Sequence, residues 1–213
     1  MQTESDFGTV LQAVIALIAI ANPFAAVPIF HAMVPRHDPA AMRHAANRVS
    51  IAVFLILAGA VLIGGTVLEL FGISFAAFRA GGGLVVTLTG LDMLRSKASD
   101  SPEDGAQGAA DPFIVPLAMP LIAGPGTIIT AMTMVARNSI AGRPWLVLIA
   151  IAVLAVVVWL VLTMSGWLQQ RLGARGQGIV VRFMGLVLVA IGAQLVLTGI
   201  ADFFALPSPA VYH

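Results

Sequence analysis

The amino-acid sequence predicts an all-α polytopic membrane protein with six transmembrane helices in two inverted three-helix repeats, helices one and four being broken at mid-membrane. The first reason is composition, since 59% of the 213 residues are hydrophobic and 10% are charged, whereas soluble domains carry about 25% charged residues. The second is that apolar stretches of roughly eighteen or more residues recur along the chain, each long enough to cross ~30 Å of hydrocarbon. The third is that helix-breaking residues recur at corresponding places in the two halves.

The expected spans follow one another through short connections, apart from two longer loops. In chain order they cover residues 7–30, 48–70, 74–94, 113–136, 145–168 and 179–203. The loop between the third and fourth spans reads "SKASDSPEDGAQGAADP", a composition typical of a mobile polar linker. We therefore expect one membrane domain, made of a first three-helix repeat (1–98), a polar cytoplasmic linker (99–111) and a second three-helix repeat (112–213).

The two halves resemble each other at both ends of the three-span unit. Span one contains "IANPF" and span four "IAGPG", while span three contains "FRAGGGLVV" and span six "VRFMGLVLV". These stretches match residues at offsets of 102 or 103: Pro23 with Pro125, Arg79 with Arg182, and Gly82 with Gly185. Near-equal offsets at both ends of the unit indicate an internal repeat.

Loop charges predict the orientation of the chain. The first, third and fifth loops and the span ends beside them hold eight of the eleven Lys and Arg residues, and the positive-inside rule places such loops in the cytoplasm. Both termini are therefore expected on the non-cytoplasmic side. Arg79 and Arg182 would lie on opposite faces, as an inverted repeat requires, and would either snorkel to the headgroups or tie a span start to a neighbouring helix.

Helix breakers lie inside spans one and four. Residues 116–128, "PLAMPLIAGPGTI", hold three prolines and two glycines. A proline lacks an N–H and displaces the carbonyl four residues earlier from its bond, so Pro23 should free the carbonyl of Ala19, and Pro125 that of Leu121. Irregular backbone of this kind is tolerated in a membrane only where it is buried in protein or lines a watery cavity.

Paired broken spans at matching places in two inverted halves point to the substrate site of a transporter. Half-helix ends expose N–H groups that attract anions and carbonyls that attract cations. The pair in this chain is Asn22-Pro23 and Gly124-Pro125-Gly126. The alternative is that the prolines only kink the helices for packing.

Three stretches, "ANPFAAVPIF", "FGISFAAFRAGGGLVVTLTGLDML" and "VPLAMPLIAGPGTI", resemble signature stretches of the MarC family of bacterial inner-membrane proteins. The resemblance covers nearly the whole chain, and the polar linker is the most individual segment. It implies six spans, a multi-pass location in the bacterial inner membrane and transport of small neutral amino acids such as glycine and alanine.

The predicted function is a secondary transporter of small neutral amino acids that works by alternating access around a site between spans one and four. The substrate carboxylate would meet half-helix N–H groups near Gly126 and Thr127, and its ammonium group would meet the freed carbonyls of Ala19 or Leu121. The side chain of Asn22 offers donors and an acceptor, so it would line the site or cap the second half-helix.

The polar side chains within the spans each have two interpretations. Thr127 and Thr130 would donate to a bound carboxylate or bond back to their own helix. Asp92 is a candidate proton carrier, because ionisable groups inside a membrane are functional by default, or it pairs with Arg95 at the cytoplasmic interface. Because the sequence has no nucleotide-binding motif, we expect an ion gradient, of protons, to supply the energy.

Other classes of protein fit the sequence less well. There is no cysteine, no metal-ligand spacing among the histidines and no motif of a catalytic site, so we expect no enzyme, cofactor or metal. A net charge of +1 leaves no nucleic-acid footprint. Two alternative functions stay open: efflux of drugs or other small solutes, and a non-transporting membrane scaffold. The sequence does not predict an oligomeric state.

Overall fold

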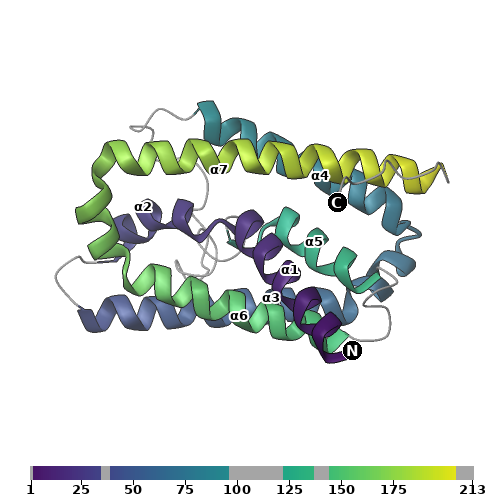
Figure 1. The fold of residues 1–213 in the computed structure, drawn as a ribbon, viewed down its shortest axis with the longest axis horizontal. Coiled ribbons are helices and arrows are strands. Elements are labelled where there is room, and N and C mark those ends of the chain that lie inside the picture. The colour runs from purple at the N-terminus through teal and green to yellow at the C-terminus, as the bar shows by residue number, and fades with distance from the viewer. Residues whose placement is uncertain (1, 35–38, 96–121, 137–143, 205–213) are drawn as a thin grey trace.

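A computed structural model describes residues 2–34, 39–95, 122–136 and 144–204, and within these ranges the regular structure is entirely helical (Figure 1). The helices are α1 (Gln2–Ala21), α2 (Pro23–Met33), α3 (Pro39–Leu70), α4 (Phe75–Arg95), α5 (Pro125–Ala136), α6 (Pro144–Thr163) and α7 (Ser165–Phe203). Figure 1 shows three layers, with α4 and α7 on one side, α3 and α6 on the other, and α1, α2 and α5 between them. The linker at 99–111 lies outside the described residues.

Four segments are long and apolar enough to cross a membrane, and they coincide with the first, second, fifth and sixth expected spans. They are Val10–Val27, Ala40–Leu70, Pro144–Thr163 and Gly178–Phe203. The third expected span is the helix α4, whose 21 residues include Arg79, Asp92 and Arg95. The fourth is described only from residue 122 onward, as the short apolar helix α5.

Differences from the expected span boundaries include the start of α3, the end of α6 and the start of α7, which begins at Ser165 and not at 179. Helix α3 begins at Pro39, well before the expected start at 48, because a helix continues past the edge of the hydrocarbon wherever its sequence keeps helix-forming residues. Helix α6 ends at Thr163, five residues before the expected end at 168. Met164 there has φ −88° and ψ 0°, so the last expected residues of span five belong to α7.

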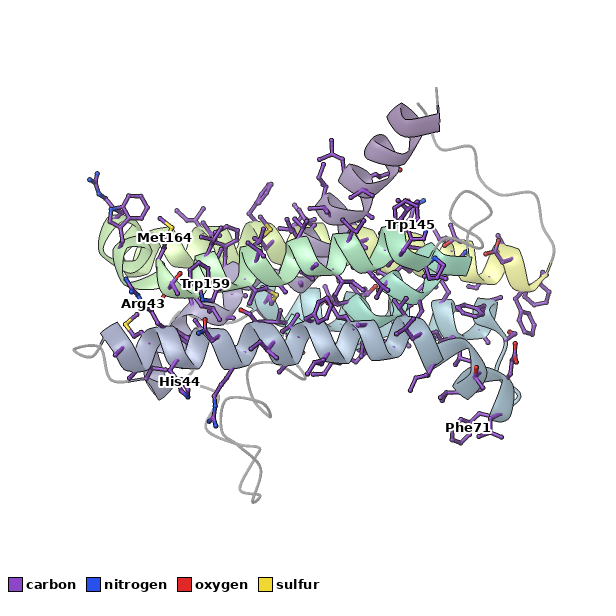
Figure 2. The ribbon with its side chains drawn as sticks, turned by 90° about the horizontal axis from the view of Figure 1, so that it is seen from below. Arg43, His44, Phe71, Trp145, Trp159 and Met164 are labelled. Atoms are coloured by element: carbon purple, nitrogen blue, oxygen red, sulfur yellow. The ribbon has the colours of Figure 1, made fainter. Side chains whose placement is uncertain are left out.

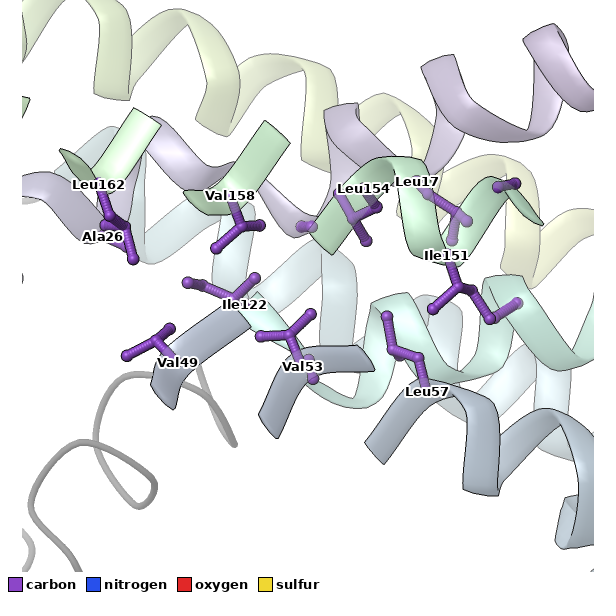
Figure 3. Close-up of a cluster of buried hydrophobic side chains, with 14 of the residues drawn as sticks. Leu17, Ala26, Val49, Val53, Leu57, Ile122, Ile151, Leu154, Val158 and Leu162 are labelled. Atoms are coloured by element: carbon purple, nitrogen blue, oxygen red, sulfur yellow. The ribbon is translucent and has the colours of Figure 1, made fainter. Parts of the chain in front are cut away.

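Helices α3 and α6 pack through interlocking aliphatic side chains (Figure 3). Val49, Val53 and Leu57 recur every four residues on α3, the spacing that places side chains on one helix face, and all three are fully buried. Opposite them lie four buried side chains of α6: Ile151, Leu154, Val158 and Leu162. The same cluster includes residues of α1 and α2, so this pair forms one wall around the middle layer.

Helices α4 and α7 pack backbone against backbone. A methyl group added at Gly83 would lie 2.6 Å from Val196 N and 2.7 Å from Gly192 O, and one added at Gly90 would lie 2.7 Å from Gly185 O. Only glycine allows backbones to approach this closely. The pair is antiparallel, because Gly83 contacts residues 192–196 whereas Gly90 contacts residues 185–189.

An ion pair closes one end of the α4–α7 pair. Arg79 Nη1 bonds to Asp202 Oδ2, and the Arg79 side chain is only 15% exposed. Of the two expectations for Arg79, a tie to a neighbouring helix is the one found. Arg182 is exposed near the opposite end of the pair, since Gly185 lies against Gly90 and Met93. The two arginines therefore lie at opposite ends of the α4–α7 pair; their location on opposite faces of the membrane stays a prediction.

We predict that Gly83→Ala destabilises the protein because its methyl group would meet the α7 backbone. Overpacking of this kind typically costs about 1–3 kcal/mol. The matched control is Gly81→Ala on the same helix, where nothing lies within 4 Å of the added methyl group; alanine there should be neutral or raise stability by up to about 1 kcal/mol. The midpoint of thermal unfolding in detergent measures both. Equal midpoints would contradict the close backbone contact.

Candidate functional site

The first expected break lies between α1 and α2, at Asn22. This residue has φ 41° and ψ 63°, the left-handed conformation that asparagine tolerates better than most residues. Its N–H donates to Ile18 O at 3.0 Å, and its carbonyl accepts from Ala25 N–H at 3.0 Å. Pro23 supplies no N–H, so the carbonyl of Ala19 loses the donor that a continuous helix would give it. The break predicted in span one is present.

The second break precedes α5, which begins at Pro125. Ile128 N–H donates to Gly124 O at 3.0 Å, so the N–H groups of Gly126 and Thr127 precede the first full helical turn and have no carbonyl partner within the helix. The hydroxyl of Thr127 donates to Ile122 O at 2.9 Å, which ties the two sides of the break together. Leu121 and the expected span four before it lie outside the described residues.

The two breaks lie beside each other in the middle layer. A methyl group added at Gly126 would lie 3.4 Å from Ile20 Cγ2 and would clash with Val86 Cγ2, so the tip of α5 contacts the last turn of α1 and the middle of α4. Residues flanking both breaks, among them Ala21 and Ala123, belong to one buried cluster. The structure therefore brings the matched Asn-Pro and Gly-Pro-Gly elements to one place.

Buried polar atoms without hydrogen-bond partners mark the site. The side chains of Asn22, Thr130 and Thr133 are 4%, 7% and 7% exposed. Within the described residues, the amide nitrogen and oxygen of Asn22 and both threonine hydroxyls have no partner. A buried polar group left unpaired costs about 1–3 kcal/mol. Such groups persist most readily where water or a ligand completes their hydrogen bonds.

Thr133 was not predicted as a site residue. It follows Thr127 and Thr130 at intervals of three along α5, and residues three apart lie near one another on a helix surface. That spacing was visible in the sequence and could have signalled the row. The hydroxyl of Thr127 bonds to Ile122 on the other side of the break, and not to its own helix; its donation to a bound carboxylate stays a prediction. The hydroxyl of Thr130 has no hydrogen-bond partner within the described residues.

Helix ends give the site both signs of charge. The C-terminal carbonyls of α1, from Ala19 to Ala21, carry the negative end of a helix dipole, and the N-terminal N–H groups of α2 and α5 carry positive ends. The buried polar side chains here are neutral. The arrangement suits a small group that carries an anion and a cation close together.

Asp92 lies away from the breaks. It is exposed on the last turns of α4, six residues beyond Val86, which is about 9 Å along a helix. Its expected role as a proton carrier gains no support from this position and stays a prediction. No group of three or more residues of metal-binding type is found within the described residues.

An all-helical chain with several membrane-length apolar helices is an integral membrane protein. It belongs to the MarC family, because the model of that family, described as "MarC family integral membrane protein", matches residues 7–204. The family predicted from the sequence is thereby confirmed.

Relatives match along almost their whole length. The UPF0056 membrane protein YhcE of Escherichia coli is 31% identical over 96% of this chain and 97% of its own. The UPF0056 membrane protein YvbG of Bacillus subtilis is 30% identical over 93% of this chain and 97% of its own. The UPF0056 inner membrane protein MarC of Escherichia coli is 33% identical over 88% of this chain and 92% of its own. No solved structure matches this chain.

We predict that Asn22→Gly leaves stability unchanged or raises it by up to about 1 kcal/mol. Glycine adopts positive φ without strain, and the change removes two unpaired polar atoms. Asn22→Val should instead destabilise by about 1–3 kcal/mol, because a β-branched residue is strained at positive φ. Thermal unfolding in detergent compares the two. If Asn22→Gly were as destabilising as Asn22→Val, the amide would have a structural role.

Proposed function

We propose that this protein is a secondary transporter of small neutral amino acids that works by alternating access at the paired helix breaks. The observation that carries the proposal is the amide of Asn22, which is 4% exposed and has no hydrogen-bond partner in the part of the chain that the structure describes. Broken helices that meet in a membrane interior are the usual substrate site of such transporters.

The charge pattern supports an amino acid as the substrate. A carboxylate fits the N–H groups of Gly126 and Thr127, which have no carbonyl partner within α5, because a helix N-terminus attracts anions. An ammonium group fits the carbonyls at the end of α1, including Ala19. The side chain of Asn22 lies on the connection between α1 and α2 and offers donors and an acceptor, so it would bind either substrate group.

The lining supports a small substrate. Gly126 already contacts the side chains of Ile20 and Val86, so a larger residue has no room at the tip of α5. The neighbouring buried residues include Ala21, Ala26 and Ala123. The hydroxyl of Thr130, one turn further along α5, would accept or donate a hydrogen bond to a short polar side chain or to water.

An inverted repeat supports alternating access, because two related halves can exchange conformations. Adding 102, the offset between Pro23 and Pro125, to the numbers of Gly83 and Gly90 gives Gly185 and Gly192. The contact Gly83–Gly192 therefore corresponds to the contact Gly185–Gly90 when the two halves are interchanged. A two-fold axis that relates the halves requires such matched contacts. Under this offset Gly83 would align with Gly185, whereas the sequence comparison paired Gly82 with Gly185 at an offset of 103.

Two glycines at positive φ also support the repeat. Gly72 has φ 65° and lies between α3 and α4, and Gly173 has φ 59° and lies inside α7. They are 101 residues apart, at the junction before the last span of each half. Each provides the left-handed residue that turns the chain.

Uptake of labelled glycine and alanine into sealed vesicles tests the proposal. Wild-type protein should accumulate both under an imposed proton or sodium gradient, and the gradient that drives accumulation identifies the coupling ion. Asn22→Gly should lose roughly ten-fold or more of the uptake at low substrate, since hydrogen bonds to a charged group are lost. Its stability should stay that of the wild type.

Gly81→Ala is the matched control for uptake, because it changes a glycine with no neighbour within 4 Å and should transport normally. Full uptake by Asn22→Gly would place the substrate elsewhere. No accumulation by folded wild-type protein under either gradient would contradict amino acid transport and favour efflux of another solute or a scaffold.

We also propose that the α3 N-terminus and the α6 C-terminus face the cytoplasm. His44 and Met164 lie at one end of the α3–α6 pair, and Phe71 and Trp145 lie at the other (Figure 2). The chain has no cysteine, so each single-cysteine variant carries one thiol. An impermeant thiol reagent should label His44→Cys and Met164→Cys from the cytoplasmic side and Phe71→Cys from the opposite side. Labelling of all three from one side, or the reverse pattern, would contradict this orientation.

A further inference from the structure

A groove of about 390 Å³ lies between α3 and α6, and no residue of the helix breaks lines it. Its walls are apolar: Ile51 and Phe54 on α3, and Ala152, Ala155 and Val156 on α6. Ile51 is 59% and Val156 56% exposed, so these side chains meet the surroundings of the protein. Its volume falls within the range of about 300–1,000 Å³ usual for ligand sites.

The two alanines create the hollow. Ala152 and Ala155 are three residues apart on α6 and lie on one face of that helix, where larger neighbours such as Val153 point elsewhere on the surface. On the adjoining face of α3, the buried row of Val49, Val53 and Leu57 packs against α6 in the core. The groove is therefore a surface slot in the membrane-facing wall and not part of the core.

One end of the slot is polar. Trp159 Nε1 donates to Asn47 Oδ1 at 2.5 Å, and both residues line the groove. Ser50 also lines it; its side chain is 6% exposed, and its hydroxyl has no partner within the described residues. A buried hydroxyl in this state favours a ligand that brings a hydrogen-bond acceptor.

This polar end lies at headgroup depth. The 32 residues of α3 extend about 48 Å, well beyond ~30 Å of hydrocarbon, so the N-terminal turns of α3 leave the apolar layer. Trp159 is four residues from the end of α6, about 6 Å along a helix. Tryptophan is enriched at this level because its ring is apolar and its N–H is polar.

A basic side chain continues the polar end. Arg43, Asn47 and Ile51 are spaced by four residues and lie on one stripe of α3, and helical side chains lean toward the N-terminus. Figure 2 shows Arg43 and Trp159 at the same end of the α3–α6 pair. The residues that line the groove include no acidic side chain. The charge at the mouth of the slot is therefore positive.

We propose that this groove binds one anionic phospholipid. An acyl chain occupies the slot along Ala152 and Ala155, the ester oxygens accept from Ser50, and the phosphate group pairs with Arg43. Basic pockets between transmembrane helices on the cytoplasmic side bind anionic headgroups by this charge complementarity. The site is separate from the helix breaks and does not depend on what the protein transports.

Fluorescence quenching by brominated lipids tests the site. The chain has three tryptophans, so Trp145→Phe with Trp167→Phe leaves Trp159 as the single fluorophore. In mixed bilayers, brominated phosphatidylglycerol should quench Trp159 more than the same mole fraction of brominated phosphatidylcholine does. The preference, expressed as a relative lipid-binding constant, should fall about five-fold in Arg43→Gln, the effect of one basic residue near a headgroup.

Matched variants separate this site from the surrounding lipid. Arg95→Gln removes an exposed arginine outside the groove and should keep the preference. Ala155→Leu should fill the slot and abolish it, whereas Val153→Leu, on a 39% exposed neighbour, should not. If Ala155→Leu fails to fold, the comparison of Arg43→Gln with Arg95→Gln still tests whether the groove prefers an anionic lipid.

Two results would overturn the proposal. Equal quenching by both lipids would mean that the groove holds only ordinary surrounding lipid. Weak quenching by both lipids that increases when the protein is diluted in the bilayer would mean that a second copy of the chain occupies the groove.

Discussion

The structure depends on one constraint, that hydrocarbon provides no hydrogen-bond partners for the backbone. The long helices α3, α6 and α7 bond their N–H and C=O groups internally and form the outer layers. At the two helix breaks the carbonyl of Ala19 loses the donor of a continuous helix, and the first N–H groups of α5 have no partner within that helix. Asn22 and Gly124, at these breaks, are buried between the layers. The layered arrangement follows from this need, because only the interior of the protein can hold free backbone groups next to other polar atoms.

Much of this arrangement could be predicted from the sequence because its causes are local. A proline lacks an N–H wherever it stands, so the break at Pro23 and the start of α5 at Pro125 follow from residue type alone. Apolar length identifies four membrane-crossing segments in the same way. The boundary at Pro39 was missed because a helix can extend into water, where hydropathy no longer reports it.

The rest of the site could not be predicted because it depends on which elements meet. Nothing in the sequence near Gly126 indicates that Ile20 and Val86 close around it. The partner of Arg79 is 123 residues away, at Asp202, and no local pattern selects it. The left-handed conformation of Asn22 was not predicted either, since proline at the next position does not by itself require it.

The glycine contacts between α4 and α7 have a consequence for how this sequence can evolve. Where two side chains interlock, as for Val53 and Leu154, a larger residue on one helix can be balanced by a smaller one on the other. Gly83 faces Gly192, and Gly90 faces Gly185, so both partners are already the smallest residue available. No second substitution can restore the fit, and these four positions have no accessible neutral exchange. The two halves of the chain can diverge elsewhere, but at this contact a substitution in one half cannot be compensated by a substitution in the other.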